Sequence, residues 1–261
     1  MAEAKLMLRL LRATPEPELT AALGARLCYS DTDIASLEEA LAPRAEALVE
    51  RLMSYGHLSP IEHASFTFGV EGVSRALLAQ LTRHRIASFS VQSQRYVANE
   101  AGFDYVLPPA IRALGAEAVA EYEKQMETIH GFYAHWLQAG LAAEDARFVL
   151  PNAAQTRILF TMNARELRHF LSLRCCMRAQ WEIRRLAWAM LGILRREAPA
   201  LFADAGADCL RGGCGEGKMS CKRAAEVKAL DAALSELAAA GASDAQILEF
   251  VTEHIGNAAG I

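Results

Sequence analysis

The sequence predicts an α+β fold, because it contains few strand patterns and many helical ones. Residues 63–70 alternate between apolar and polar side chains, which is the period of a half-buried strand. Residues 116–139 form the longest helical pattern, and Gly140 closes it. Apolar residues spaced three and four apart between Ile183 and Leu194 predict a further helix.

In the first part of the chain, the apolar residues 5–11 predict a short strand. Pro15 then begins a segment of helical composition that continues through Leu27. A second helix is expected over residues 43–55, with Gly56 as its stop.

The strand at residues 63–70 should end at Gly72. Ser74 is a suitable N-cap for a helix that continues to about Arg85. Residues 88–94 are rich in serine and glutamine, so we expect a loop or an irregular strand there.

A short helix is expected at residues 144–148, and residues 155–162 can form a strand. Residues 163–166, Asn-Ala-Arg-Glu, have the form of a capping box that begins a helix toward Leu171.

Near the end of the chain the composition changes. Residues 210–222 form a loop rich in glycine and cysteine, followed by helices expected at 224–239 and 243–254. We therefore expect a main domain of residues 1–208 and a helical C-terminal extension of residues 209–261.

The composition limits the class of protein. Hydrophobic residues make up 52% and charged residues 22%, as in ordinary globular proteins. The net charge of -4 argues against a general nucleic-acid binder. The chain has no apolar run of about 18 residues, which a membrane span needs. We expect a cytoplasmic protein with no membrane or nucleic-acid partner and, because its six cysteines are sparse, with reduced thiols.

One segment has a strong basic bias. Between Glu71 and Glu100 there is no carboxylate, but there are Arg75, Arg83, His84, Arg85 and Arg95. On a helix, Gln80, Arg83 and His84 would share one face. Arginine suits phosphate because its planar guanidinium donates paired hydrogen bonds. Arginines at a helix end can also be simply solvated, and charge and spacing leave both interpretations open.

Residues 83–95 contain Arg-His-Arg, seven residues, Ser, one residue and Arg, which resembles the signature of the flavin-dependent thymidylate synthases. Residues 56–63, 147–151 and 163–174 resemble the same family in the same order. The resemblance covers about residues 5–205. Four short motifs in order are far more specific than any one of them.

The resemblance implies a domain, residues 1–208 here, in which helices pack around a central mixed β-sheet. It also implies a homotetramer whose active sites are shared between subunits. The implied reaction converts dUMP to dTMP, with FAD as cofactor, methylenetetrahydrofolate as carbon donor and NADPH as reductant.

The same resemblance implies the site residues. The flavin would contact His57, Ser59, Arg83, His84, Arg85, Ser90, Asn163, Arg165 and His169. The nucleotide would contact Gln80, Arg83, Gln92, Ser93, Gln94, Arg95, Arg147 and Arg174. Ser93 and Arg174 are the expected catalytic residues. Ser93 should polarise and position the base, because an unassisted serine hydroxyl is a weak nucleophile. Reduced flavin is anionic near neutral pH, so nearby guanidinium groups would stabilise it.

Simpler roles exist for several of these residues. Asn163 is an N-cap whatever else it does. His57 could be an ordinary loop histidine, and His169 a partly exposed helix residue. Without the resemblance, Arg147 and Arg174 would pass as surface arginines.

Two features depart from the motifs or lie outside them. Val91 stands where many family members have a glutamate two residues before the serine, and Gln92 could compensate. Cys209, Cys214 and Cys221 form a C-x4-C-x6-C arrangement without a paired C-x-x-C. We expect free thiols or loop packing there and assign no metal site.

Two other functions remain as alternatives. The chain could be a non-catalytic nucleotide- or RNA-binding helical protein that uses the basic segment, or another flavoprotein such as a reductase. Bound flavin would make the protein yellow, unlike a simple RNA binder. Tight binding of dUMP would distinguish it from a reductase.

Overall fold

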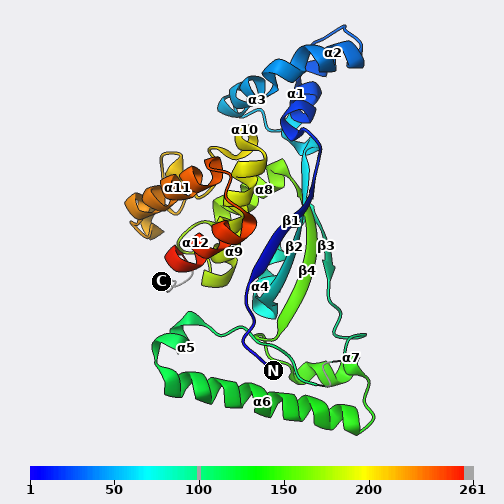
Figure 1. Cartoon of the computed structure of the whole chain (residues 1–261), viewed down its shortest axis with the longest axis vertical. Coiled ribbons are helices and arrows are strands. Elements are labelled where there is room, and N and C mark those ends of the chain that lie inside the picture. The colour runs from blue at the N-terminus through cyan, green and yellow to red at the C-terminus, as the bar shows by residue number, and fades with distance from the viewer. Residues whose placement is uncertain (99–100, 256–261) are drawn as a thin grey trace. The chain divides into compact units, whose positions relative to one another are not determined.

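The computed structural model describes residues 1–98 and 101–255, and it has the α+β composition that the sequence predicts. Four strands form a sheet in the order β1-β2-β4-β3 (Figure 1). They are β1 (Met7–Ala13), β2 (Ser65–Ser74), β3 (Ala87–Val91) and β4 (Gln155–Asn163).

The sheet is antiparallel, so the mixed sheet expected from the family resemblance is not found. The hydrogen bonds show the direction of the two central strands. The Ala164 N–H, after β4, donates to the Ala64 oxygen, before β2, and the Arg75 N–H, after β2, donates to the Ala154 oxygen, before β4. The beginning of each strand is therefore paired with the end of the other.

The helices account for most of the remaining structure. They are α1 (Pro17–Leu27), α2 (Ile34–Leu41), α3 (Ala45–Ser54), α4 (Arg75–Leu81), α5 (Pro109–Ala113), α6 (Ala116–Gln138), α7 (Ala143–Ala146), α8 (Ala164–Arg174), α9 (Trp181–Glu197), α10 (Pro199–Phe202), α11 (Ala224–Ala239) and α12 (Asp244–His254). The predicted caps at Ser74 and Asn163 form, each side-chain oxygen accepting from a backbone N–H of the first turn, and Ser243 caps α12 in the same way.

Three local expectations were wrong. Strand β2 continues past Gly72, which adopts a left-handed φ of 69° inside the strand. Helix α4 ends at Leu81 and not near Arg85, so Gln80, Arg83 and His84 do not share a helix face. Helix α2 was not anticipated; its N-cap Asp33 accepts from the backbone N–H of Ser36.

Contacts divide the chain into two compact units. Unit 1 comprises Met1–Met7, Gly69–Arg83 and Phe89–Leu159. Unit 2 comprises Leu8–Phe68, His84–Ser88 and the chain from Phe160 onward. Each unit has a hydrophobic core of its own, and the two are described separately below.

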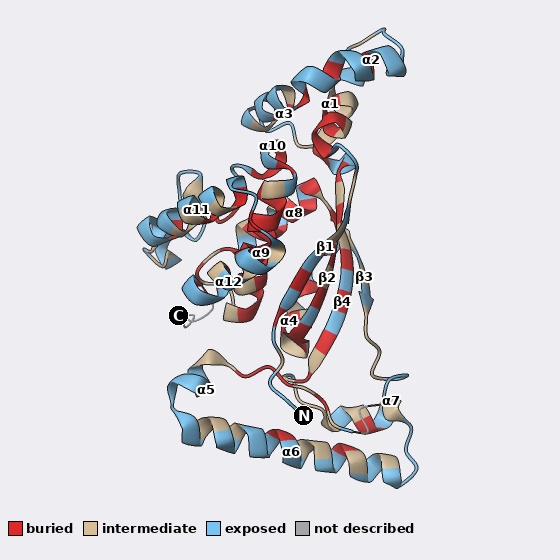
Figure 2. Cartoon of the chain, in the orientation of Figure 1, coloured by how far each residue is buried: buried red, intermediate tan, exposed pale blue. Residues whose placement is uncertain are grey.

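Helix α9 is the centre of unit 2. It is buried over nearly its whole length and contacts α8, α10, α11 and α12 (Figure 2). A Cβ added to Gly192 would lie 2.8 Å from Leu234 of α11 and 2.7 Å from Ile247 of α12, so these helices approach α9 closely. The C-terminal helices thus complete the core of unit 2. A separable extension at residues 209–261 stays a prediction, and its last residues, 256–261, lie outside the described part.

In unit 1, the long helix α6 covers a small cluster of buried residues, Phe103, Tyr105, Met126 and Ala154. Along α6 only Met126 and Tyr133 are buried, and the rest of the helix is half-buried or exposed (Figure 2). Most of this helix is therefore accessible in the single chain.

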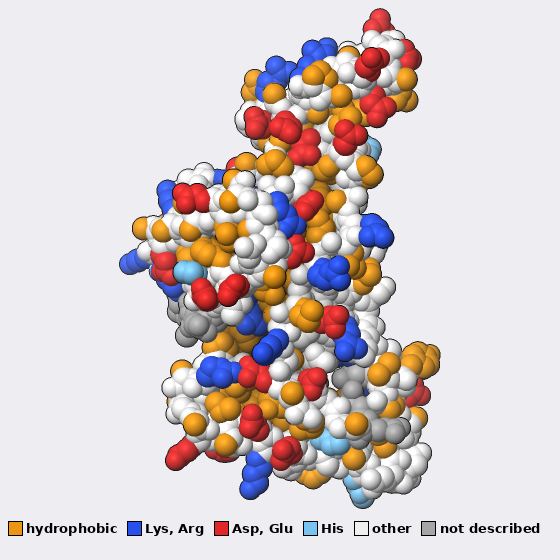
Figure 3. All heavy atoms as spheres, in the orientation of Figure 1, with side chains coloured by type: hydrophobic (Ala, Val, Ile, Leu, Met, Phe, Trp, Pro, Cys, Tyr) orange, Lys and Arg blue, Asp and Glu red, His pale blue; other side chains and the backbone are white. Residues whose placement is uncertain are grey.

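The charge distribution agrees with the composition. Over α1–α3, acidic and basic side chains lie side by side (Figure 3), and Glu46 and Glu50 lie between Arg44 and Arg51 in the sequence. The surface of these helices is therefore of mixed charge. Across residues 1–98 and 101–255, no helix is both long and apolar enough to cross a membrane.

Candidate active site

The main candidate site in unit 2 is a cavity of about 800 Å³. Its walls come from the end of α3 and the residues that follow it, from Ile86, from α8 as far as Ser172, and from Asp204 and Arg211. Three of the predicted flavin residues, Asn163, Arg165 and His169, line it. The volume lies within the usual range of about 300–1,000 Å³ for ligand pockets.

The other predicted flavin residues of unit 2 lie next to this cavity in the chain. His57 and Ser59 are exposed and flank Leu58, which lines the cavity. Arg85 is exposed and precedes Ile86, another lining residue. His84 is buried, and its ring lies 5.8 Å from the ring of His169, edge to face.

Two arginines of the cavity wall form ion pairs with carboxylates. Arg165 forms an ion pair with Glu62, with side chains 53% and 44% exposed. Arg168 donates to the Leu201 oxygen at 2.7 Å and pairs with Asp204. Exposed pairs of this kind contribute only about 0–1 kcal/mol, so Arg165 can exchange Glu62 for an anionic ligand at little cost.

A buried hydrogen-bonded chain links α8 to the basic segment. The Arg174 Nε–H donates to His84 Nε2 at 3.2 Å, and the His84 Nδ1 is 2.9 Å from Glu166 Oε1. Because Nε2 accepts a hydrogen bond, Nδ1 must carry the proton and donate it to Glu166. His84 is therefore a neutral imidazole that connects the carboxylate to the arginine.

The electrostatics agree with the neutral ring. Burial lowers the pKa of His84 below its ordinary value, and the charge of Arg174 lowers it further, while the hydrogen bond to Glu166 acts in the opposite direction. Sequence reasoning missed Glu166 because it was assigned to a capping box. Its backbone N–H does receive the Asn163 cap at 2.9 Å, but its side chain turns to His84 instead.

The predicted nucleotide residues, apart from Arg174, lie in unit 1. The backbone of Gln92 is fixed on both sides: its N–H donates to the Arg157 oxygen at 3.0 Å, and its oxygen accepts from Arg75 Nη2 at 2.9 Å. Arg75 was noted only as part of the basic segment. The structure makes it an anchor for the residues just before Ser93.

Two predicted phosphate-binding arginines meet at Glu144 of α7. The Arg95 Nε–H donates to the Glu144 carboxylate at 2.7 Å, and the Arg147 Nε–H donates to its backbone oxygen at 3.1 Å. Nothing in the sequence pointed to Glu144, because its partner Arg95 is 49 residues away.

Ser93 lies in a turn after β3. Its hydroxyl oxygen accepts the backbone N–H of Arg95 at 3.1 Å, and its carbonyl accepts the N–H of Val97 at 3.1 Å. These contacts shape the turn and do not draw a proton from the hydroxyl. The positioning role of Ser93 stays a prediction.

The remaining predicted residues of unit 1 differ in exposure. Gln80 is half-buried on α4, Gln94 is half-buried in the turn, and Arg83 and Ser90 are exposed. The predicted site residues thus fall into two groups, one within each unit. Ser90, expected at the flavin, and Arg83, expected at both the flavin and the nucleotide, belong to unit 1.

Comparisons with known proteins agree with the motifs. Residues 9–200 match the family described as "Thymidylate synthase complementing protein". The chain is 53% identical over 223 residues to a flavin-dependent thymidylate synthase of Geobacter sulfurreducens, which covers 85% of this chain and 96% of that protein. It is 47% identical over 236 residues to that of Clostridium tetani, covering 84% and 94%, and 41% identical over 187 residues to that of Pyrococcus horikoshii, covering 70% and 76%. The family match spans every predicted site residue from His57 to Arg174.

Proposed function

The chain belongs to the family of flavin-dependent thymidylate synthases, and we infer that it methylates deoxyuridine monophosphate to thymidylate. The structural observation that supports this most is that Asn163, Arg165 and His169, which are distant from the Arg-His-Arg motif in sequence, line one cavity beside His84. The cofactor, substrates and residue roles below are parts of the same proposal.

FAD is the flavin that we propose for the cavity of unit 2. The donor set fits an anionic cofactor, because Arg165 and His169 line the cavity and the ion pair of Arg165 with Glu62 is about half exposed. His57, Ser59, Arg85 and Asn163 would supply further hydrogen bonds. Flavin contacts of Arg83 and Ser90, which belong to unit 1, stay a prediction from the family resemblance. Bound there, the flavin supplies the hydride that completes the methyl group, with NADPH as its reductant and methylenetetrahydrofolate as the carbon donor.

Arg95 and Arg147 are the proposed phosphate ligands of dUMP. The ion pair of Arg95 with Glu144 is about half exposed, with side chains 51% and 46% accessible, so it contributes only about 0–1 kcal/mol. A phosphate with nearly two negative charges would compete well for Arg95 and would accept paired hydrogen bonds from its guanidinium. Gln80, Gln92 and Gln94 would supply neutral contacts.

Ser93 and Arg174 are the residues that we propose at the reacting base. Ser93 holds the base through its hydroxyl, on a turn anchored by Arg75. Arg174 offers a permanent positive charge to a base carbonyl oxygen, where negative charge develops during addition to the ring. His84 and Glu166 keep its guanidinium oriented.

A homotetramer with shared active sites is the proposed assembly. Unit 1 exposes large apolar side chains that a subunit contact would remove from water: Phe148 is 84% exposed and Leu114 is 77% exposed. Phe148 directly follows Arg147, so a subunit contact there would adjoin the proposed phosphate site. The absence of nucleic-acid partners and the cytoplasmic location stay predictions.

The proposal is tested with the purified full-length protein. We expect a yellow protein, or one that becomes yellow with FAD, whose NADPH oxidation in the presence of methylenetetrahydrofolate depends on dUMP and yields dTMP. A protein that cannot be reconstituted with FAD would favour the nucleotide- or RNA-binding alternative. A flavoprotein that oxidises NADPH without binding dUMP would be a reductase.

A further inference from the structure

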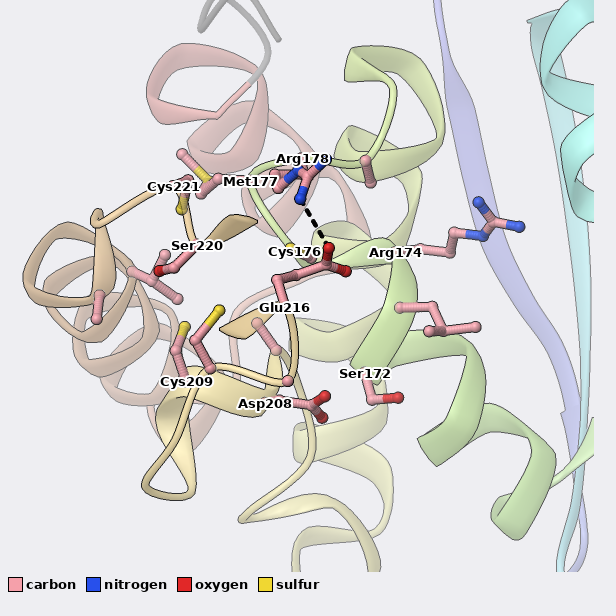
Figure 4. Close-up of a pocket in the computed structure, with 17 residues that line it drawn as sticks. Ser172, Arg174, Cys176, Met177, Arg178, Asp208, Cys209, Glu216, Ser220 and Cys221 are labelled. Carbon is pink, nitrogen blue, oxygen red and sulfur yellow. Dashed lines mark hydrogen bonds and ion pairs between the residues drawn. The ribbon is translucent and has the colours of Figure 1, made fainter. Parts of the chain in front are cut away.

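Four of the six cysteines meet at a second cavity of unit 2, of about 330 Å³ (Figure 4). Cys209, Cys214 and Cys221 come from the Gly/Cys loop, and Cys176 comes from the segment just after α8. Sequence spacing could not associate Cys176 with the loop, because the nearest loop cysteine is more than 30 residues away. The structure therefore supplies the fourth thiol that the C-x4-C-x6-C arrangement lacked.

The loop cysteines face inward from an otherwise exposed loop. Every residue from 211 to 219 is exposed except Cys214, which is half-buried and lines the cavity. Cys176, Cys209 and Cys221 are half-buried as well and line the same cavity. All four thiols are thus partly withdrawn from solvent at one cavity.

The loop is already tied to the segment that carries Cys176. Arg178 donates from Nη1 to Glu216 Oε2 at 2.7 Å and to the Met219 oxygen at 2.8 Å (Figure 4). These contacts hold the part of the loop between Cys214 and Cys221. Arg178, which makes them, is two residues along the chain from Cys176. Asp208 and Glu216 also line the cavity, and Glu216 is neutralised by its ion pair with Arg178.

We propose that Cys176, Cys209, Cys214 and Cys221 bind a soft divalent metal ion of the Zn²⁺ class, which fastens the Gly/Cys loop to the end of α8. Four cysteine thiolates are a common ligand set of structural zinc, and such sites are tetrahedral and closed. Each thiol releases its proton to solvent as its sulfur binds, so four protons leave for each ion and no oxidant is needed.

The loop must close to complete the site. Within residues 1–98 and 101–255, no three His, Cys, Asp or Glu side chains are grouped closely enough to hold an ion as they stand. A Cβ added at Gly212 or Gly213 would meet no described atom within 4 Å, so the backbone just before Cys214 is not packed against other residues. Cys28 is exposed and Cys175 is fully buried, and neither lines the cavity.

The test uses the full-length protein, reduced and purified without a metal-affinity step. We expect elemental analysis to find about one zinc per chain after incubation with zinc and gel filtration, the stoichiometry of a single four-ligand site. Cobalt(II) added to the metal-free protein should produce thiolate-to-metal charge-transfer absorption and the visible bands of tetrahedral cobalt. Both readouts are independent of thymidylate synthesis, so this proposal can fail or succeed separately from the proposed function.

Variants identify the ligands. Cys176→Ser and Cys214→Ser should each lower zinc content by about tenfold or more, because a closed structural site needs all four ligands. The matched control Cys28→Ser should keep full zinc content. Cys214 is in the exposed loop, so its variant remains informative if Cys176→Ser fails to fold. Wild-type protein that takes up neither zinc nor cobalt, or that forms disulfides between these cysteines under the same reducing conditions, would overturn the proposal.

Discussion

Glu166 positions Arg174 through one intervening side chain, the neutral ring of His84. The ring can accept from Arg174 only while its other nitrogen donates to a partner, and Glu166 is that partner. Glu166 itself is buried and does not need to contact substrate to affect the reaction.

Removing the Glu166 carboxylate should therefore reduce activity through its effect on His84 and Arg174. We expect Glu166→Ala to lower kcat/KM for dUMP by about 10-fold to 100-fold, since a hydrogen bond involving a charged group contributes about 1.5–3 kcal/mol. Glu166→Gln, whose amide oxygen can still accept from His84, should retain more activity. The control Glu249→Ala, on the exposed side of α12, should leave kcat/KM unchanged. Equal losses in the Ala and Gln variants would argue against this relay.

The pair of His84 and Glu166 also predicts that the free energy of unfolding depends on pH. The folded-state pKa of His84 is lowered, so the unfolded chain binds more protons below about pH 6.5, the ordinary histidine value. The contribution of the neutral ring to the free energy of unfolding is thus present above that pH and is lost as the pH falls. The difference in unfolding free energy between wild type and His84→Gln, measured in urea, should shrink from about pH 8 to about pH 5. A difference that stays constant would contradict the neutral ring.

Ser93 provides the complementary prediction in unit 1. If it only positions the base, Ser93→Ala should lower kcat by about tenfold or less, because a neutral hydrogen bond contributes about 0.5–1.5 kcal/mol. Steady-state kinetics and dUMP binding measure this. Abolished turnover with intact affinity and structure would assign Ser93 a larger chemical role.

Local rules explain why some residues could be predicted and others could not. Asn163 acts as the expected N-cap, because capping depends on neighbours within one turn. Glu166 and Glu144 were missed, because their partners lie 82 and 49 residues away in the chain. Sequence patterns report local contacts, whereas these pairs depend on how the elements pack.

At the scale of elements, strand β2 contains a position that only glycine fits. Gly72 has a φ of 69°, and a Cβ there would lie 2.0 Å from the Lys5 oxygen. The strand was expected to end at this residue because glycine often marks a strand end. A glycine inside a strand can instead mark a close approach of another backbone, as it does here.

Gly72→Ala should therefore destabilise the protein markedly, by at least about 2 kcal/mol, from a strained φ and a steric clash with backbone. Gly131→Ala is the matched control: it lies within α6 with nothing near its added methyl, so it should stabilise by up to about 1 kcal/mol. Urea midpoints at constant m-value measure both. A neutral Gly72→Ala would show that β2 does not approach Lys5 closely.

The longer helices were predictable because each combines an apolar period with a cap or a glycine stop. This holds for α6, α11 and α12, whose observed bounds differ from the expected ones by a residue or less. Helix α2 has a cap at Asp33 but only eight residues, and strand β3 has only five, so α2 was missed and β3 was left as irregular structure. The antiparallel sheet could not be read from the chain, because strand order depends on tertiary contacts.

At the scale of the whole molecule, the predicted site residues fall into two groups that belong to different compact units. A shared active site in an oligomer is the arrangement that the family resemblance implies. The spacing of residues along the chain cannot reveal this arrangement, because residues that meet at a subunit interface follow no fixed spacing in the sequence.

Mixing two inactive variants tests the shared site. Arg95→Ala removes a proposed ligand in unit 1 and Arg174→Ala removes one in unit 2. If different subunits supply these residues, exchange of equal amounts should restore up to about a quarter of wild-type activity, since random pairing leaves that share of sites intact. Each variant alone should stay inactive. Mixtures without recovery, despite proven subunit exchange, would place both residues in one subunit.

The central claim is that this protein builds the methyl group of thymidylate with a flavin. The most direct measurement is the mass of the nucleotide formed from dUMP and methylenetetrahydrofolate labelled at its methylene carbon, under anaerobic conditions with FAD and NADPH. We predict dTMP that carries the label, formed only when all components are present. Oxidation of NADPH without labelled dTMP would contradict the account.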